Sequence, residues 1–262
     1  MMVSLWSAAS GMIAQEMNMD VISNNLANVD TTGFKKNRVD FQDLMYQTKA
    51  VPGSPNGEGV QMPTGIQVGN GTRAIGTQKV FTSGELITSD NELDMAIEGK
   101  GFFQVLLPDG SLSYTKNGAF SKTSTGQVVT SDGYFLEPAI TIPEGYSEIS
   151  IGTDGTVSVT QGENNEIVEI GQIELATFVN QAGLIATGRN LYKPSAASGD
   201  AQLGNPGDAG FGTIRQKALE TSNVKVVEEM VKMITAQRAY EVNTKSIQTA
   251  DSMLQLANNL KR

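Results

Sequence analysis

Apolar side chains recur at helical spacing near the start of the chain. The stripe consists of residues seven apart, Leu5, Met12, Met19 and Leu26, with Ala9, Ile13 and Ile22 beside them. This spacing predicts a helix from residue 4 to about residue 28. The segment from Asp30 to Gly33 follows, and its residue types favour a turn that ends the helix.

A second helical pattern occupies the end of the chain. From Thr221 to Leu260 no Gly or Pro interrupts it, and Ser222 or Asn223 is a suitable N-cap residue. A continuous helix here would be roughly 60 Å long at about 1.5 Å per residue. Its seam steps by four and three residues, as in a coiled coil. The seam residues are Val226, Met230, Met233, Gln237, Tyr240, Thr244, Ile247, Asp251 and Leu254.

Between the two helices, short apolar runs alternate with glycine-bearing turns. The turns fall at Asp109-Gly110, Asn117-Gly118, Gly126 and Asp132-Gly133, and this spacing is typical of an antiparallel β domain. The segments 51–71 and 195–212 lack periodicity, and we interpret them as linkers or loops. The predicted class is α+β, with long N- and C-terminal helices packed as a coiled-coil-like pair and a central antiparallel β-rich domain. The strand candidates are FFQVLL, SYT, AFSK, QVVT, YFLEP, EISI, TVSVT, IVEIGQIELATFV and NLYKP.

The helical seams are unusually polar for a pair that packs alone. Gln15, Gln237, Thr244 and Asp251 lie in line with apolar positions. Such residues cost stability in a dry core but can fix register and partner choice. Because two helices alone make a poor core, we expect these helices to pack against helices of other copies of the chain.

Three asparagines crowd the end of the first helix. We expect Asn28 to terminate the helix and Asn24, one turn earlier on the same face, to bond across to another chain. The alternative is a frayed helix end with solvated amides, including that of Asn25.

Composition excludes several function classes. The 262 residues carry a formal charge of −9 with no Cys and no His. The acidic balance argues against nucleic acid and anionic membrane as partners. Without Cys or His, disulfides, zinc–thiolate sites and Ser–His–Asp catalysis are impossible. The first basic residue is Lys35, so the N-terminus does not resemble a secretory signal. We expect a cytoplasmic chain, or one exported without a cleaved signal.

The remaining chemical motifs are weak. Gly69, Gly71 and Gly76 miss the dinucleotide and P-loop spacings, and lone Asp-Gly pairs are hairpin turns rather than calcium loops. The carboxylates are Asp90, Glu92, Asp94 and Glu98. They could form an acid–base pair, but alternating acids more often line the wet face of a strand. We predict no catalytic, cofactor-binding or metal residue, no cofactor and no small-molecule substrate.

Three function classes remain open on these residues. They are a structural filament subunit, a carboxylate-based hydrolase, and a secreted binding module that acts as a monomer.

Four long motifs resemble one family. They are SLWSAASGM, NMDVISNNLANVDTTGFKKNRVDFQDLMYQ, MAIEGKGFFQV and ETSNVKVVEEMVKMITAQRAYEVNTKSIQTADSMLQ. Together they are similar to the flagellar rod and hook family, most of all to its distal rod branch, with a proximal rod branch as the alternative. The resemblance covers essentially the whole chain.

The resemblance implies a helical homopolymer that forms a rigid hollow drive shaft across the periplasm. Its implied partners are further copies of itself, other rod proteins below, the hook protein above, the surrounding P and L rings and the flagellar type III export apparatus. It also implies a helical, channel-lining part at 1–30 and 220–262, a connecting part at 31–70 and 195–219, and a β-rich outer part at 71–194.

Two sets of residues follow as candidate assembly positions. Distal rod members carry an extension that is implicated in rod stiffness; here it spans Thr48 to Gly65, with Thr48, Pro52, Pro55, Pro63 and Gly65, and a mobile loop is the alternative. The predicted inter-subunit helix positions are Leu5, Trp6, Met12, Met19, Ile22, Asn24, Leu26, Asn28, Val226, Met230, Met233, Gln237, Tyr240, Thr244, Ile247 and Leu254.

Overall fold

A computed structural model describes residues 2–52, 55–56, 60–61, 64–161 and 166–259. The chain forms two compact units. The first unit contains Met1–Ala27, Asn37–Gln78 and Lys225–Arg262, and the second contains Asn28–Lys36 and Lys79–Val224. The predicted division into channel-lining, connecting and outer parts refers to layers of an assembly, and it stays a prediction.

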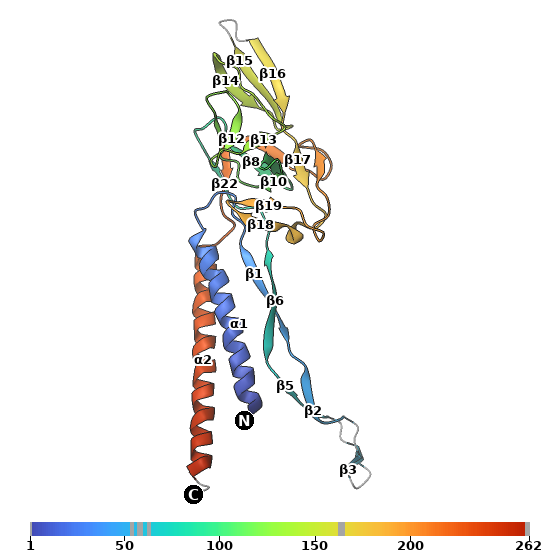
Figure 1. Ribbon diagram of the computed structural model, residues 1–262, viewed down its shortest axis with the longest axis vertical. Coiled ribbons are helices and arrows are strands. Elements are labelled where there is room, and N and C mark those ends of the chain that lie inside the picture. Colours follow the sequence, from blue (N-terminus) through green and yellow to red (C-terminus); the bar gives the residue numbers. More distant parts are fainter. Residues whose placement is uncertain (1, 53–54, 57–59, 62–63, 162–165, 260–262) are drawn as a thin grey trace. The chain divides into compact units, whose positions relative to one another are not determined.

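Two long helices lie side by side in the first unit (Figure 1). They are α1 (Met2–Ala27) and α2 (Val226–Asn259), and they run antiparallel. Both predicted helices are confirmed. The predicted N-cap of the second helix is wrong, because Asn223 uses its side chain elsewhere. Asn223 Oδ1 accepts a hydrogen bond from Lys36 N at 2.8 Å, and its Nδ2 donates to Val80 O at 2.7 Å. The helix therefore begins after the segment that these bonds hold.

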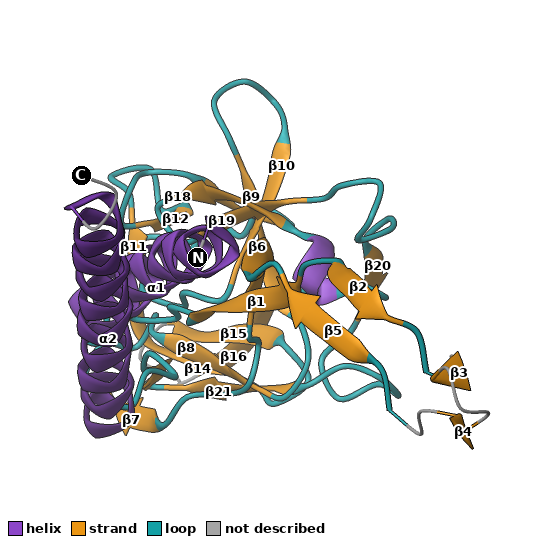
Figure 2. Ribbon diagram, turned by 90° about the horizontal axis from the view of Figure 1, so that it is seen from below, coloured by secondary structure: helices purple, strands orange, loops and turns teal. Residues whose placement is uncertain are grey.

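A long β ribbon completes the first unit (Figures 1 and 2). β1 (Asn37–Asp43) pairs with β6 (Thr72–Lys79), and β2 (Tyr46–Ala50) pairs antiparallel with β5 (Ile66–Gly69). The short strands β3 (Pro55–Asn56) and β4 (Val60–Gln61) pair beyond them. The prediction of a loop over 51–71 is therefore wrong. The proline and glycine residues in this segment are typical of turns, so the local sequence predicted a loop. Strand formation depends on the partner strand as well, which the local sequence does not show.

One place where the ribbon contacts α1 is the turn after β5. Gly71 follows β5 with a φ of +108°, a conformation that suits glycine, and a side chain there would collide with Ser10 of α1. Ser10 Oγ also accepts a hydrogen bond from Thr72 N at 3.2 Å. Helix and ribbon thus meet where only glycine leaves room.

The second unit is built almost entirely of strands. They are β7 (Leu86–Thr88), β8 (Met95–Glu98), β9 (Phe102–Leu106), β10 (Leu112–Thr115), β11 (Phe120–Lys122), β12 (Val128–Thr130), β13 (Phe135–Glu137), β14 (Tyr146–Ile151), β15 (Thr156–Gln161), β16 (Glu166–Gln172), β17 (Leu175–Thr177), β18 (Ile185–Gly188), β19 (Leu191–Lys193), β20 (Gln202–Gly204), β21 (Thr213–Gln216) and β22 (Ala218–Glu220), with a short 3₁₀ turn η1 (Gln181–Gly183).

The largest sheet among the described residues has nine strands. Its main path is β11-β12-β13-β9-β10-β19-β18, and β17 joins β9 to β20. β14, β15 and β16 form a separate sheet, and β21 pairs with β8 and β22 with β7. The pairs are antiparallel, and the predicted strand runs all form strands. The predicted α+β class is confirmed.

Strand β9 separates two apolar clusters. Phe103 packs in one with Phe120, and Phe102 packs in the other with Phe178 and Tyr192. Consecutive strand residues point to opposite faces, which explains the division. The aromatic rings meet edge to face, with centroids 5.2 Å apart for Phe103 and Phe120 and 5.8 Å apart for Phe102 and Phe178.

Candidate assembly surface

Small side chains take part in the contact between α1 and α2. Ala14 on α1 and Ala236 on α2 are buried. Gly11 lies against Asn243, which is one heptad after Ala236, and a Cβ at Gly11 would lie 2.9 Å from Asn243 Nδ2. Small residues at heptad spacing let two helices approach closely.

A buried polar group fixes one end of this contact. Asn25 Nδ2 on α1 donates to Glu229 Oε2 on α2 at 3.3 Å and to Asn37 O at 2.9 Å, and Asn25 Oδ1 accepts from Asn37 N at 2.8 Å. Lys232 Nζ lies 2.7 Å from Glu229 Oε1. The amide therefore ties α1 to α2 and to the first residue of β1.

Asn25 is the functional residue that the sequence analysis missed. It lies three residues after Ile22, on the same face of the helix, and both side chains are buried. That spacing was available in the sequence. Glu229, one heptad before Ala236, gave the matching signal on the other helix.

Large apolar side chains lie on the opposite side of α2. Val227 and Val231 are each two residues from buried Glu229, and Ile234 is two residues from buried Ala236. Two residues correspond to a rotation of about 200° around a helix. This exposed stripe of α2 consists of Val227, Val231, Ile234, Val242, Met253 and Leu256, all exposed.

A matching exposed stripe follows α1. It consists of Trp6, Ile13 and Met17, seven and four residues apart, and the side chains of Trp6 and Ile13 are 71% and 65% exposed. A helix with apolar residues on both faces is typical of a position buried on all sides. Isolated exposed apolar residues need no explanation, but aligned ones mark an interaction surface.

A groove lies beside the exposed stripe of α2. Ser4 of α1 forms one wall, and the other lining residues are Val242, Lys245, Ser246, Thr249, Ala250 and Met253 of α2. Its volume of ≈ 430 Å³ is ample for several side chains.

The predicted helix positions fall into three groups, and their role between subunits stays a prediction. Thr244 Oγ1 lies 3.5 Å from Met12 Sδ, so the structure brings these two together across the helices. Ile22 is buried within the chain, and Asn28 is half-buried in the second unit. The half-buried positions are Leu5, Met12, Met19, Leu26, Met233, Thr244 and Ile247. The exposed ones are Trp6, Asn24, Val226, Met230, Gln237, Tyr240 and Leu254.

The predicted extension lies on the ribbon. Thr48 is exposed in β2, Pro52 is exposed just after it, Pro55 begins β3, and Pro63 lies outside the described residues. Gly65 is packed where a Cβ would collide with Ala50 O. The stiffening role of these residues stays a prediction.

The weak chemical motifs have structural roles. Asp94 accepts hydrogen bonds from Ser89 Oγ and Asn91 Nδ2, and Glu98 pairs with Arg215 at 3.1 Å. Among the described residues, no group of three Asp or Glu side chains could hold a metal ion. None of the described helices has the length and apolarity of a membrane span.

Comparisons with known proteins agree in both halves of the chain. The model for flagella basal body rod proteins matches residues 5–35, that for the flagellar hook protein FlgE/F/G D1 domain matches 96–159, and that for the flagellar basal body rod FlgEFG protein C-terminal region matches 215–260.

Relatives that match over their full length indicate which branch of the family the chain resembles. The flagellar basal-body rod protein FlgG of Borreliella burgdorferi is 52% identical over 100% of both chains. The FlgG proteins of Caulobacter vibrioides and Bacillus subtilis are 48% and 40% identical, over 99% and 100% of this chain and 100% of their own. The solved Helicobacter pylori hook protein FlgE2 is 15% identical with a TM-score of 0.26, over 71% of this chain and 43% of its own, and this likeness carries no argument.

Paired terminal helices with unused apolar faces and the three matched regions define a subunit of the flagellar rod and hook class. Within that class, the chain belongs to the FlgG family of flagellar basal-body rod proteins.

Proposed function

We propose that this chain is a structural subunit of the flagellar distal rod, and that it polymerises helically into a hollow drive shaft through the exposed stripes of α1 and α2. The single observation that carries this proposal is that different side chains of α1 and α2 form the contact within the chain and the exposed stripes. Small residues, a polar group and a few larger side chains such as Ile22 join α1 to α2, while the large apolar residues of the two exposed stripes are exposed.

The energetics favour contacts with several neighbours. Burying one large apolar side chain contributes roughly 1.5–3 kcal/mol. Nine such side chains form the two exposed stripes, so no single contact dominates. A heterologous interface that repeats without closing gives an open helical polymer, and each subunit then shares torque with its neighbours.

The ribbon supplies a second surface for the same purpose. Phe41, Met45, Tyr46 and Ile75 are exposed on it. A two-stranded ribbon is marginally stable alone in water. Packing on neighbouring subunits would give it the rigidity that a stiffening extension requires.

Family membership supports a wider role, which we include in the proposal. The partners are other rod proteins, the hook protein, the P and L rings and the export apparatus, and the shaft crosses the periplasm after export without signal cleavage. The chain performs no catalysis in this role, because its work is mechanical.

The test compares two isoleucines with opposite expected outcomes. Ile234 on the exposed stripe of α2 is 57% exposed, and Ile167 on β16 is 74% exposed. Assembly of the purified full chain is followed by sedimentation and electron microscopy as concentration is raised. Ile234→Ser should raise the concentration at which filaments form by at least about tenfold, and Ile167→Ser should leave that concentration unchanged.

Both variants should unfold within about 0.5 kcal/mol of the parent chain, since neither residue is buried. Filaments of normal length and abundance from Ile234→Ser at the concentration that suffices for the parent chain would refute the proposal.

A further inference from the structure

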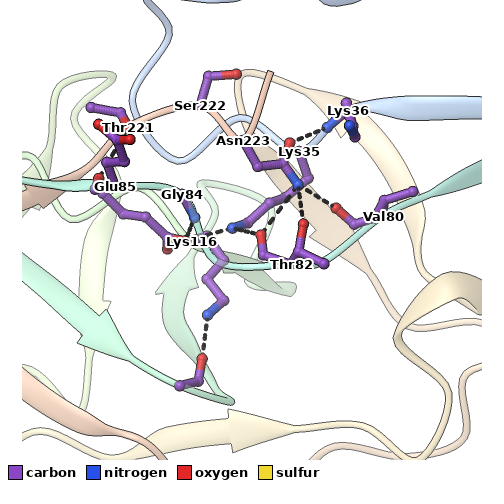
Figure 3. Close-up of polar contacts among 12 residues, drawn as sticks. Lys35, Lys36, Val80, Thr82, Gly84, Glu85, Lys116, Thr221, Ser222 and Asn223 are labelled. Carbon is purple, nitrogen blue, oxygen red and sulfur yellow. Dashed lines mark hydrogen bonds and ion pairs between the residues drawn. The ribbon is translucent and has the colours of Figure 1, made fainter. Parts of the chain in front are cut away.

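Three segments that are distant in sequence meet in a buried polar cluster of the second unit (Figure 3). They are residues 33–36, 80–85 and 220–223, and we call this cluster the clasp. The chain passes between its two units after residues 27, 36, 78 and 224. Three of these passages, after residues 36, 78 and 224, lie within two residues of a clasp segment. The clasp therefore holds three of the four points at which the chain enters or leaves the second unit.

A fully buried ion pair forms the centre of the clasp. Lys35 Nζ lies 2.6 Å from Glu220 Oε1, with side-chain exposures of 0% and 1%. Lys35 Nζ also donates to Thr82 O at 2.8 Å, and Gly84 N donates to Glu220 Oε1 at 2.8 Å. These bonds join all three segments through two side chains.

Backbone groups reinforce the same junction. Gly33 N donates to Glu220 O at 2.8 Å, and Lys36 N donates to Asn223 Oδ1 at 2.8 Å. Asn223 Nδ2 donates to Val80 O at 2.7 Å. Two of the sequence motifs noted above, TTGFKK and ETSNV, thus contact each other here.

The clasp is not electrically balanced. Lys116 is buried beside the ion pair, and its Nζ donates to Gly99 O at 2.9 Å. Two buried ammonium groups are therefore influenced by one carboxylate, which pairs directly with Lys35 alone. The second carboxylate oxygen, Glu220 Oε2, is also buried and accepts no hydrogen bond from the described residues.

A buried pair of this kind adds little net stability, because desolvation offsets the attraction between its charges. Loss of one partner is costly, because the other charge then stays buried and unpaired. A clasp that lacks one of the two charged partners is therefore much less stable than a complete clasp.

We propose that the Lys35–Glu220 pair is a conformational latch that fixes the entry and exit of the chain and closes only when both ends of the chain have reached the clasp. The two residues are 185 positions apart. Until Glu220 arrives, burial of Lys35 would leave an unpaired charge, so the segment 33–36 stays open. The latch is a property of the folded chain and does not depend on the rod proposal.

Native-state hydrogen exchange of the full chain tests the latch. Lys35→Met and Glu220→Gln should each speed exchange at the Gly33, Lys36 and Gly84 amides by at least about 100-fold. The double variant Lys35→Met/Glu220→Gln, made in a chain that also carries Lys116→Met, should return to within about tenfold of the parent, since none of the three buried charges is then left unpaired. Glu98→Gln, which breaks an exposed ion pair with Arg215, should leave these amides unchanged.

Parent-like exchange in both single variants would overturn the proposal. A double variant as open as the single ones would also overturn it.

The parent chain provides a measurement that needs no variant to fold. The Gly33, Gly84 and Asn223 amides come from the three segments and should open together, with protection factors within about threefold of one another. Protection that differs among the three segments would show that no common latch exists.

Discussion

Asn25 Nδ2 donates to Glu229 Oε2 across α1 and α2, and both side chains are buried although neither is apolar. The same amide also receives and donates hydrogen bonds at the backbone of Asn37. One side chain thus sets the register of the helix pair and the start of the ribbon. A polar residue at such a position specifies one alignment at some cost in stability.

Replacement of Asn25 should destabilise the first unit. Asn25→Ala leaves Asn37 N, Asn37 O and Glu229 without these partners, and we expect a loss of about 2 kcal/mol in the free energy of unfolding. Urea unfolding followed by the helical circular dichroism signal measures it. Asn24→Ala, one residue away with an exposed side chain, is the matched control and should change stability by less than about 0.5 kcal/mol. Equal losses from both variants would contradict the role of Asn25.

Asn24 itself is predicted to act between subunits. Asn24→Leu should leave the monomer folded, with an unchanged unfolding midpoint, and should impair polymerisation. Electron microscopy of the purified chain reads the second effect. Normal filament growth by this variant would show that the amide has no role in assembly.

Two glycines of the ribbon should respond oppositely to the same change. Gly71→Ala combines a φ of +108° with a collision at Ser10, so this turn of the ribbon should separate from α1 at Ser10. Gly76→Ala adds a Cβ that meets nothing within 4 Å, so it should be neutral or slightly stabilising. Exchange at the Thr72 amide, which donates to Ser10 Oγ, distinguishes them. Unchanged protection in Gly71→Ala would contradict the close approach.

Lys116 gives the second unit a pH-dependent stability. Burial lowers the pKa of its ammonium group from the ordinary 10.5 to about 8, with Glu220 opposing and Lys35 reinforcing the shift. Between pH 8 and 10.5 the unfolded chain therefore binds more protons than the folded chain, so stability should rise with pH. From pH 7 to pH 9.5 we expect a gain of about 2 kcal/mol in the free energy of unfolding.

The matched variant for this effect is Lys116→Met. It retains the tyrosines and other lysines, so the difference between the two chains isolates Lys116. Chemical unfolding at pH 7 and at pH 9.5 measures that difference. If the free energy of unfolding changed equally with pH in the two chains, the lowered pKa of Lys116 would be contradicted.

Local patterns predicted the helices and the strands of the second unit well. The heptad spacing from Leu5 to Leu26 and the turns at Gly110, Gly126 and Gly133 depend on neighbouring residues only, and the structure has a helix and turns there. The strands within 51–71 were missed because β3, β4 and β5 have only two to four residues and are stabilised by pairing across the chain. Such pairing leaves little trace in either strand alone.

The contact face of α2 was predicted only in part, since the seam residue Thr244 does contact Met12 of α1. The predicted seam through Met230 and Gln237 lies one residue away from buried Glu229 and Ala236. Hydrophobicity pointed to the larger side chains, whereas close approach between helices selects small ones. The clasp was invisible for another reason, because nothing local links Lys35 to Glu220 across 185 positions.

In the proposed rod, the exposed stripe of α2 contacts other subunits. The chain contains no Cys, so single cysteines report contacts without background. Rods isolated from cells that carry only Val231→Cys should give intermolecular cross-links when the thiol carries a short photoreactive linker, which bonds to whichever residue of the neighbouring subunit faces it. Ser124→Cys, exposed in a turn of the second unit, is the matched control and should give none. Cross-links from Val231→Cys but not from Ser124→Cys would confirm that the exposed stripe of α2 contacts other subunits. The absence of cross-links from intact Val231→Cys rods would contradict it.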